Sequence, residues 1–311
     1  MFSIQQRVAQ LVTILLLTYT YLATSNGSYG TVSLEGYGNY ATIFEALEAA
    51  PSNSSCPVYI TLQAKEYHEQ VLVQNDKTNI VMTGQGIEKT FIIHNGSSLT
   101  NQTTMSSATF GVEAVGFVAK YITFVNLAGP GAGPAVAFRS VADKTILYKC
   151  KLDGYQDTLF TQLNRHFFRE CDIYGTIDFV FGYSLAVLQN CNIFLRKPLT
   201  GQDDVISAQG KSEVNETSGL VFQNCTITAD PRLPETEGSA YLGRPWKPYS
   251  TTIIMESYLG KVVNPNGWLA WQEDNQTLNN VYYAEYRNRG PGSQTSARIK
   301  CKGLQIFYQP K

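Results

Sequence analysis

Short apolar segments separated by glycine, asparagine and aspartate occupy most of the chain from Val58 onward. They are rich in β-branched and aromatic residues, they are too short for helices, and their apolar positions do not follow a helical period. The pattern therefore predicts an all-β protein. The clearest predicted strands lie at 58–62, 80–83, 90–93, 119–124 and 135–138.

A longer pattern, apolar-x-x-Cys-x-Leu/Ile, recurs in the middle of the chain around Cys150, Cys171, Cys191 and Cys225. The intervals between these cysteines are 21, 20 and 34 residues. Nearly equal intervals of about 20 residues are typical of a parallel β-helix, in which equivalent side chains stack from coil to coil. A sandwich or an antiparallel barrel would give hairpin spacing without this recurrence. We therefore expect a parallel β-helix with one long insertion.

One short helix is predicted ahead of the strands, at 42–50. Thr42 and Glu45 form a capping box, the apolar residues fall on one face, and Pro51 follows the helix. A helix in this place is expected to cap the open edge of the first coil.

The N-terminal residues 1–24 resemble a secretory signal peptide. Arg7 precedes an apolar run at 11–17, which is too short to span a bilayer, and small residues surround Ala23. A buried N-terminal helix is the alternative. We expect one domain at 25–311, secreted and without membrane attachment once the signal is removed. Asn-x-Ser/Thr sequons, which suit a secreted glycoprotein, occur at Asn26, Asn53, Asn95, Asn101, Asn215, Asn224 and Asn275.

Charge and cysteine content narrow the classes of partner. The net charge of −1 gives no electrostatic reason to expect nucleic acid. The six cysteines show no C-x-x-C spacing, so we expect no zinc and no other cofactor. In stacked coils Cys150 could bridge Cys171, and Cys191 could bridge Cys225; equally, all four could be reduced thiols in a buried ladder.

Two copies of the repeat carry an aspartate seven positions after the cysteine, namely Asp157 and Asp178. If these copies form successive coils, the two residues lie about 4.8 Å apart in backbone. Two carboxylates about 5 Å apart repel by about 3 kcal/mol at an effective dielectric constant near 20. That energy corresponds to roughly two pKa units, so one carboxyl should stay protonated while the other ionises. The alternative is that the aspartates only cap turns between coils.

Candidate partners for the aspartates come from later in the chain. Asp178 precedes an apolar run, where an unpaired charge would be costly, and Arg244 in a Gly-Arg-Pro-Trp segment is a candidate counter-ion. The aromatic residues that could stack on a sugar ring or line a cleft are Phe160, Phe181, Trp246 and Trp268.

Three segments, in order, resemble the signature blocks of the pectin methylesterases (pectinesterases). They are Gly154-Tyr-Gln-Asp-Thr-Leu159, Asp178-Phe-Val-Phe-Gly182 and Leu242-Gly-Arg-Pro-Trp246. The resemblance extends from about Thr31 to about Ile306, and it is to the plant type without an inhibitor-like N-terminal pro-region.

This resemblance implies a right-handed parallel β-helix and hydrolysis of galacturonate methyl esters in the cell wall. By motif, Asp178 would be the nucleophile, Asp157 the general acid and then base, and Gln156 an oxyanion donor. Arg244 would hold Asp178 ionised and oriented. The implied partners are methylated pectin and, in addition, proteinaceous pectinesterase inhibitors, and we expect a monomer.

Pro134 departs from the family pattern. It stands where the family usually has the glutamine of Gln-Ala-Val-Ala-Leu-Arg, which is expected to supply a second oxyanion donor. Proline has no N–H and no side-chain donor. Two alternatives to an active esterase follow: a pectin-binding homologue with impaired catalysis, and a β-helix glycoside hydrolase such as a polygalacturonase, which also uses paired carboxylates.

Overall fold

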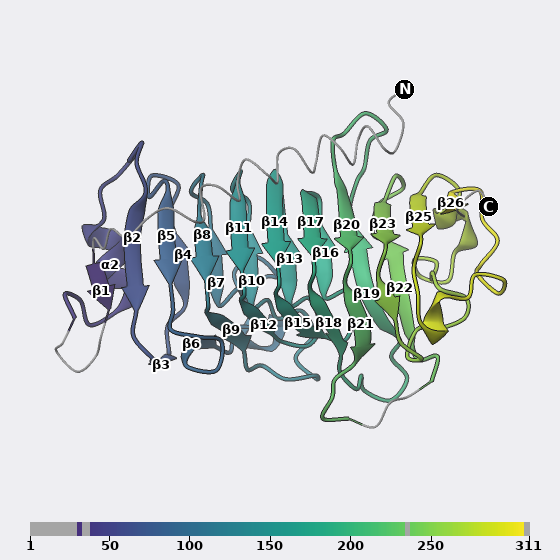
Figure 1. Ribbon diagram of the computed structural model, residues 1–311, viewed down its shortest axis with the longest axis horizontal. Helices are drawn as coiled ribbons and strands as arrows, with labels where there is room; N and C mark the ends of the chain where they lie inside the picture. Colours follow the sequence, from purple (N-terminus) through teal and green to yellow (C-terminus); the bar gives the residue numbers. More distant parts are fainter. Residues whose placement is uncertain (1–29, 33–37, 234–236, 308–311) are drawn as a thin grey trace.

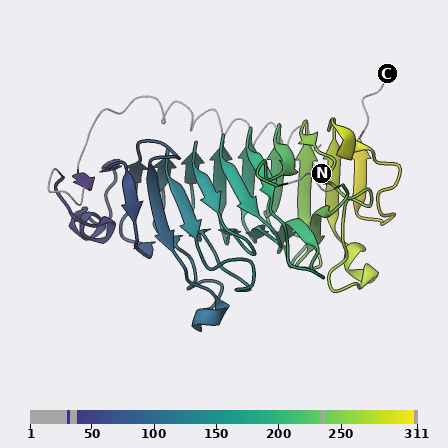
Figure 2. The same ribbon diagram turned by 90° about the horizontal axis from the view of Figure 1, so that it is seen from below.

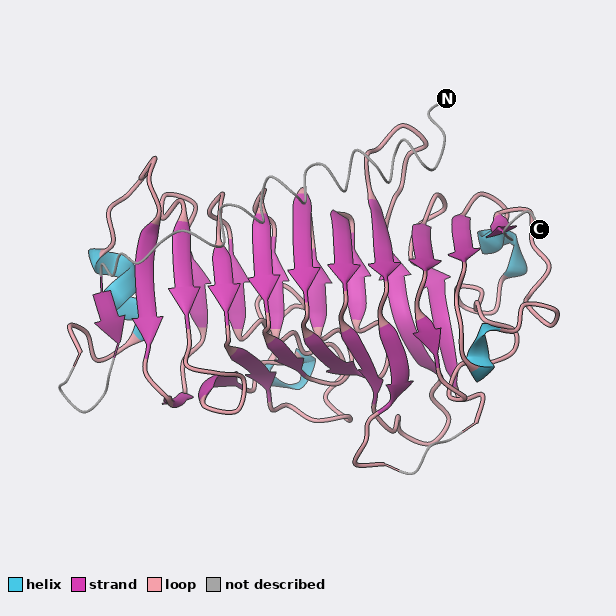
Figure 3. Cartoon of the chain, in the orientation of Figure 1, coloured by secondary structure: helices cyan, strands magenta, loops and turns pink. Residues whose placement is uncertain are grey.

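Three parallel β-sheets wind into a right-handed β-helix, as shown in the computed structural model (Figure 1, Figure 3). The structure describes residues 30–32, 38–233 and 237–307. The predicted signal peptide at 1–24 lies outside these residues. Within them, no helix is long and apolar enough to cross a membrane.

Each coil of the β-helix contributes at most one strand to each sheet, and the eleven-stranded sheet extends beyond the other two at both ends of the stack. The eleven-stranded sheet contains β1 (Gly30–Val32), β2 (Val58–Leu62), β5 (Ile80–Thr83), β8 (Val118–Lys120), β11 (Thr145–Tyr148), β14 (Arg165–Arg169), β17 (Leu185–Gln189), β20 (Gly219–Gln223), β23 (Thr251–Met255), β25 (Tyr282–Tyr286) and β26 (Leu304–Phe307). The eight-stranded sheet contains β3 (Lys65–Tyr67), β6 (Thr90–His94), β9 (Thr123–Asn126), β12 (Lys151–Asp153), β15 (Asp172–Gly175), β18 (Asn192–Leu195), β21 (Thr226–Ala229) and β24 (Tyr258–Leu259). The seven-stranded sheet contains β4 (Val71–Val73), β7 (Phe110–Val112), β10 (Phe138–Ser140), β13 (Leu159–Thr161), β16 (Val180–Gly182), β19 (Asp204–Gln209) and β22 (Ala240–Pro245).

The cysteine repeat marks successive coils, as its spacing predicts. Its first apolar positions, Leu147, Phe168, Leu188 and Phe222, pair in register in the eleven-stranded sheet, and all four are fully buried. The four repeat cysteines are also buried, and all six cysteines of the chain are free thiols. The sequence left open whether these cysteines form disulfides or stay reduced, and in the structure they are a buried row of reduced thiols. Burial raises the pKa of the Cys150, Cys171 and Cys191 thiols well above the usual range.

The residue before each repeat cysteine turns the chain from the eleven-stranded into the eight-stranded sheet. Lys149, Glu170, Asn190 and Asn224 have φ values of 50°, 53°, 55° and 51°, in the left-handed region. Tyr121 makes the same turn with φ 59°, so the predicted strand at 119–124 is in fact two, β8 and β9. The prediction was wrong because this corner carries no glycine or proline to mark it. The strand predicted at 135–138 starts only at Phe138.

The predicted capping helix is present as α2 (Ile43–Ala49), at the purple end of the stack in Figure 1. The capping box of Thr42 and Glu45 forms, and Ile43, Ala46 and Leu47 are buried. The carboxylate of Glu69 accepts the N–H groups of the first turn. The ammonium of Lys77 donates to carbonyl groups at the last turn. Both helix ends are therefore tied to the first coils.

Three 3₁₀ helices complete the described elements. They are η1 (Ser98–Thr100), η2 (Asn275–Leu278) and η3 (Pro291–Ser293). The blue segment around η1 projects from the body in Figure 2. It folds back on the loop ahead of β10, because the N–H of Ser98 donates to the carbonyl of Pro134 at 3.3 Å.

Candidate active site

Asp157 and Asp178 occupy equivalent positions in adjacent coils, each two residues ahead of a strand of the seven-stranded sheet. Leu159 of β13 pairs with Val180 of β16, and the N–H of Asp157 donates to the carbonyl of Ile177 at 3.0 Å. Both aspartates have left-handed backbones, with φ values of 66° and 50°. The predicted stacking of the two residues is confirmed. The shared turn presents two carboxyl groups side by side.

The two carboxyl groups are buried, and their environments differ. Burial raises the pKa of Asp157 well above its usual range, and the charge of Asp178 raises it further. Burial also raises the pKa of Asp178, while the hydrogen bonds and positive charge of Arg244 oppose that rise. Asp178 therefore loses its proton first, and Asp157 keeps its proton to a higher pH.

Arg244 lies on β22, which is two strands away from β16 in the order β22-β19-β16. Its Nε donates to Oδ1 of Asp178 at 2.8 Å, and its Nη2 donates to Oδ2 at 2.6 Å. The contact predicted from the sequence is therefore present, in the two-pronged geometry that makes arginine–carboxylate pairs strong. It fixes the plane of the Asp178 carboxylate as well as its charge.

Aromatic side chains continue the site along the outer face of the seven-stranded sheet. The rings of Phe160 and Phe181 stack with centroids 4.3 Å apart, and both are 4% exposed. Trp246 contacts Phe181 edge-on at 5.9 Å and Tyr183 at 4.6 Å, and it stays partly exposed. Phe160, Phe181 and Trp246 thus form one apolar cluster on the same sheet as Arg244.

Trp268 does not join this cluster, contrary to the prediction from the sequence. Its side chain is 1% exposed, its ring stacks on Tyr283 at 4.1 Å, and its indole N–H donates to Glu285 at 3.1 Å. A tryptophan with its ring packed and its N–H paired in the core cannot contact a ligand. The backbone of Trp268 pairs with Gly243, and the ring packs against that glycine, since a Cβ there would meet a ring carbon at 3.2 Å.

Trp271 is the residue that the sequence interpretation missed. The guanidinium carbon of Arg244 lies 4.7 Å from the centroid of the Trp271 ring, which is partly exposed and packs against the apolar cluster. The Arg244 guanidinium therefore contacts an aromatic ring in addition to the Asp178 carboxylate. The available signal was a second tryptophan three residues after Trp268.

Gln156 and Pro134 lie on consecutive coils beside the aspartates. The N–H of Ala135 donates to the carbonyl of Gln156 at 3.2 Å, and both Gln156 and Pro134 are partly exposed. Gln156 directly precedes Asp157 in the sequence, and the oxyanion role that the motif implies for its side chain stays a prediction. Pro134 offers only its carbonyl, which already accepts from Ser98.

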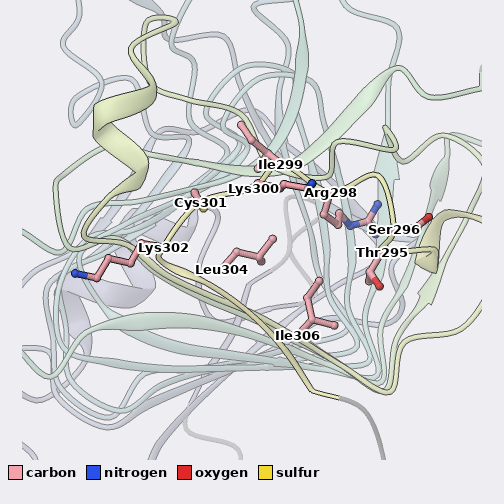
Figure 4. Close-up of a pocket in the computed structure, with 9 residues that line it drawn as sticks. All are labelled: Thr295, Ser296, Arg298, Ile299, Lys300, Cys301, Lys302, Leu304 and Ile306. Atoms are coloured by element: carbon pink, nitrogen blue, oxygen red, sulfur yellow. The ribbon is translucent and has the colours of Figure 1, made fainter.

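A cavity of about 490 Å³ lies elsewhere, at the C-terminal end of the stack, and includes none of these residues (Figure 4). Its lining consists of Thr295, Ser296, Arg298, Ile299, Lys300, Cys301, Lys302, Leu304 and Ile306. In the part of the chain that the structure describes, no cluster of three or more His, Cys, Asp or Glu side chains could hold a metal ion. The charged groups that the structure brings together at this site are the two carboxyl groups and Arg244.

The comparison with known families decides which family carries this site. The model of the family described as Pectinesterase matches residues 30–311. The chain belongs to the pectinesterase family. The match covers all three sheets and every residue of the site.

Relatives and solved structures agree with the pectinesterase family. The chain is 46% identical over 277 residues to a pectinesterase of Petunia integrifolia, covering 88% of this chain and 74% of the relative. It is 44% identical over 281 residues to a pectinesterase/pectinesterase inhibitor of Prunus persica, covering 89% and 54%. Several curated relatives are thus about twice as long as the part matched. The carrot pectin methylesterase structure superposes with a TM-score of 0.89 at 39% identity, covering 92% of this chain and 90% of that one. The Aspergillus niger enzyme gives 0.81 at 28% identity, covering 92% of each.

Replacing Asp157 with asparagine is expected to stabilise the protein at neutral pH. Folding raises the pKa of Asp157, so the folded state holds this proton more tightly than the unfolded chain does. The stability that Asp157 contributes is therefore present at low pH and is lost as pH rises through its folded pKa. An amide does not titrate, and asparagine tolerates a left-handed backbone.

The difference in melting temperature between Asp157→Asn and the wild type should therefore be small below the usual aspartate pKa of about 3.9 and should grow above it. Thermal melts across this range check the prediction, with Asp172→Asn as a control for the same chemical change on β15. A difference that does not vary with pH would contradict a raised pKa at Asp157.

Proposed function

We propose that this protein hydrolyses the methyl esters of galacturonate units in pectin and releases methanol. One observation carries the proposal: two stacked, buried carboxyl groups, of which Asp178 accepts two hydrogen bonds from Arg244 and Asp157 accepts none from it. An ester hydrolase that uses a carboxylate nucleophile needs that carboxylate ionised, and a neighbouring protonated carboxyl can give its proton to the leaving alcohol. Family membership supports the substrate class.

In the first half-reaction, the Asp178 carboxylate attacks the carbonyl carbon of the methyl ester. The N–H of the Gln156 side chain donates to the oxygen that becomes negative. The C–O bond to the methoxyl group then breaks, and Asp157 gives its proton to that oxygen, so methanol leaves. Asp178 is left joined to the substrate as an anhydride, and Asp157 is left ionised.

In the second half-reaction, the Asp157 carboxylate takes a proton from water, and the hydroxide attacks the substrate carbon. The anhydride opens, Asp178 returns as a carboxylate, and Asp157 is protonated again. The galacturonic acid released loses its proton to solvent. Arg244 favours this cycle because it stabilises the ionised form of Asp178, which is present before the first attack and again after the anhydride opens.

The aromatic cluster of Phe160, Phe181 and Trp246, extended by Trp271, is the proposed sugar-binding surface. Sugar rings present apolar C–H faces, which pack on aromatic side chains. Trp246 and Trp271 are the partly exposed members and therefore the ones that a polymer can reach. We propose pectin as the main partner, with proteinaceous pectinesterase inhibitors as a second class.

The same proposal places the protein outside the cell. The signal-peptide pattern at 1–24 and the sequons support secretion to the cell wall, where pectin is found. Of the described sequons, the asparagines at 53, 95, 101, 215, 224 and 275 are exposed.

Purified protein is expected to release methanol from methylated pectin without shortening the polymer. Asp157→Asn and Asp178→Asn should each abolish turnover and leave pectin binding nearly intact, because each removes one half of the acid and nucleophile pair. Methanol and reducing-end assays on the same samples check this, with Asp172→Asn as the matched control. New reducing ends would instead identify a glycoside hydrolase, and a retained rate in either variant would refute the roles.

Pro134→Gln is expected to raise the turnover rate. Loss of one oxyanion donor costs on the order of a hundredfold or more in rate, and glutamine at this position restores a donor one coil from Gln156. Pro134→Ala is the matched control, since it removes the ring without adding a donor. Methanol release only from the Pro134→Gln protein would favour a pectin-binding role for the natural chain. Equal rates in the glutamine and alanine variants would show that no second donor is missing.

A further inference from the structure

Arg196 directly follows β18. It is equivalent in position to Thr176 and Tyr155, which lie in the two preceding coils. The N–H of Arg196 donates to the carbonyl of Gly175 at 2.8 Å, and the N–H of Thr176 donates to the carbonyl of Tyr155 at 3.0 Å. Arg196 is 9% exposed, which is unusual for arginine. A buried guanidinium must be paired, so its partners show what it holds.

The side chain of Arg196 reaches back two coils to the turn that carries Asp157. Its Nη1 donates to the carbonyl of Gly154 at 2.8 Å, and its Nη2 lies 2.7 Å from Oδ1 of Asp153. Its guanidinium carbon is 4.8 Å from the centroid of the Tyr155 ring. Three consecutive residues, 153–155, are therefore held by one side chain.

The turn held in this way is tight and directly precedes the site. A Cβ on Gly154 would meet Oγ1 of Thr158 at 2.6 Å, and that hydroxyl donates to the carbonyl of Tyr155 at 3.1 Å. Gln156 and Asp157 lie between these two anchors, and Asp157 has a left-handed backbone. The position of both functional side chains depends on how firmly residues 153–155 are fixed.

Neutralising the nearby aspartates does not require Arg196. Asp230 accepts from Nε of Arg232 at 2.9 Å, whereas Nε of Arg196 is 3.8 Å from it. Asp153 also has Lys151, whose Nζ is 3.6 Å away. Among the described residues, neither Lys151 nor Arg232 duplicates the contacts of Arg196 with the Gly154 carbonyl and the Tyr155 ring.

We propose that Arg196 is a positioning residue, which clamps the 153–155 segment and so fixes Gln156 and Asp157 for ester hydrolysis. The expected effect of this clamp on kcat rests on the proposed function. The clamp affects the orientation of Asp157 and Gln156. In the described part of the chain, it does not contact the aromatic residues that are proposed to bind the sugar. Its loss should therefore lower kcat and leave KM nearly unchanged.

Arg196→Met tests the clamp, because methionine keeps an unbranched apolar stem and removes the guanidinium. We expect kcat to fall between about tenfold and about a hundredfold, the cost of a misplaced catalytic group, with KM within about threefold. Arg232→Met is the matched control, since Arg232 pairs with Asp230 and packs over Tyr174 as Arg196 does. Ile227→Val, in the buried core of β21, controls for a modest loss of stability. Both controls should keep the wild-type kcat.

Hydrogen exchange gives a readout that does not depend on activity. Peptides that cover 153–158 should exchange faster in Arg196→Met than in the wild type, and they should be unchanged in Arg232→Met. Unchanged exchange in Arg196→Met, or a kcat that follows melting temperature alone across all three variants, would overturn the proposal. A wild-type protein that releases no methanol would refute the proposed function, and the exchange result would still decide whether Arg196 holds the turn.

Discussion

The backbone register between β13 and β16 is the constraint on which the rest of the site depends. Leu159 opposite Val180 places Asp157 beside Asp178, and a parallel β-helix repeats that register at strand spacing, about 4.8 Å. A slip of one residue would turn one of the two carboxyl groups away. The buried ladder of Leu147, Phe168 and Leu188 in the eleven-stranded sheet opposes such a slip, because it pairs only in the observed register. The same register therefore sets both the packing of the core and the spacing of the two carboxyl groups.

Register alone gives two equivalent carboxyl groups, and Arg244 makes them different. Arg244 lies on β22, two strands away from β16, and it donates a hydrogen bond to each oxygen of the Asp178 carboxylate. Asp157 is as deeply buried, and no residue that the structure describes forms an ion pair with it, so burial keeps its proton in place. The ring of Trp271 packs against the same guanidinium, with its centroid 4.7 Å from the guanidinium carbon. A single residue of β22 thus gives the two carboxyl groups different electrostatic environments.

The sequence was most informative where a side chain repeats with the coil. The cysteine spacing predicted the β-helix and the stacking of Asp157 on Asp178, because both follow from register. It was least informative where the direction of a side chain depends on tertiary pairing. Trp268 and Trp271 are three residues apart in one segment, and only the packing of the folded chain shows that the ring of Trp268 lies in the core and that of Trp271 does not. The contacts of Arg196 span two coils, so no local pattern could reveal them.

The proposed reaction requires that Asp157 carries a proton at neutral pH beside an ionised Asp178. Infrared spectroscopy measures this directly, because a protonated carboxyl group has a carbonyl band that a carboxylate lacks. Asp204, whose pKa burial raises to about 8, adds a second such band, so the informative quantity is the difference between wild type and Asp157→Asn at one pH. We predict that a protonated-carboxyl band is present in the wild type near pH 7 and is lost in Asp157→Asn. Identical spectra in that region would contradict the account.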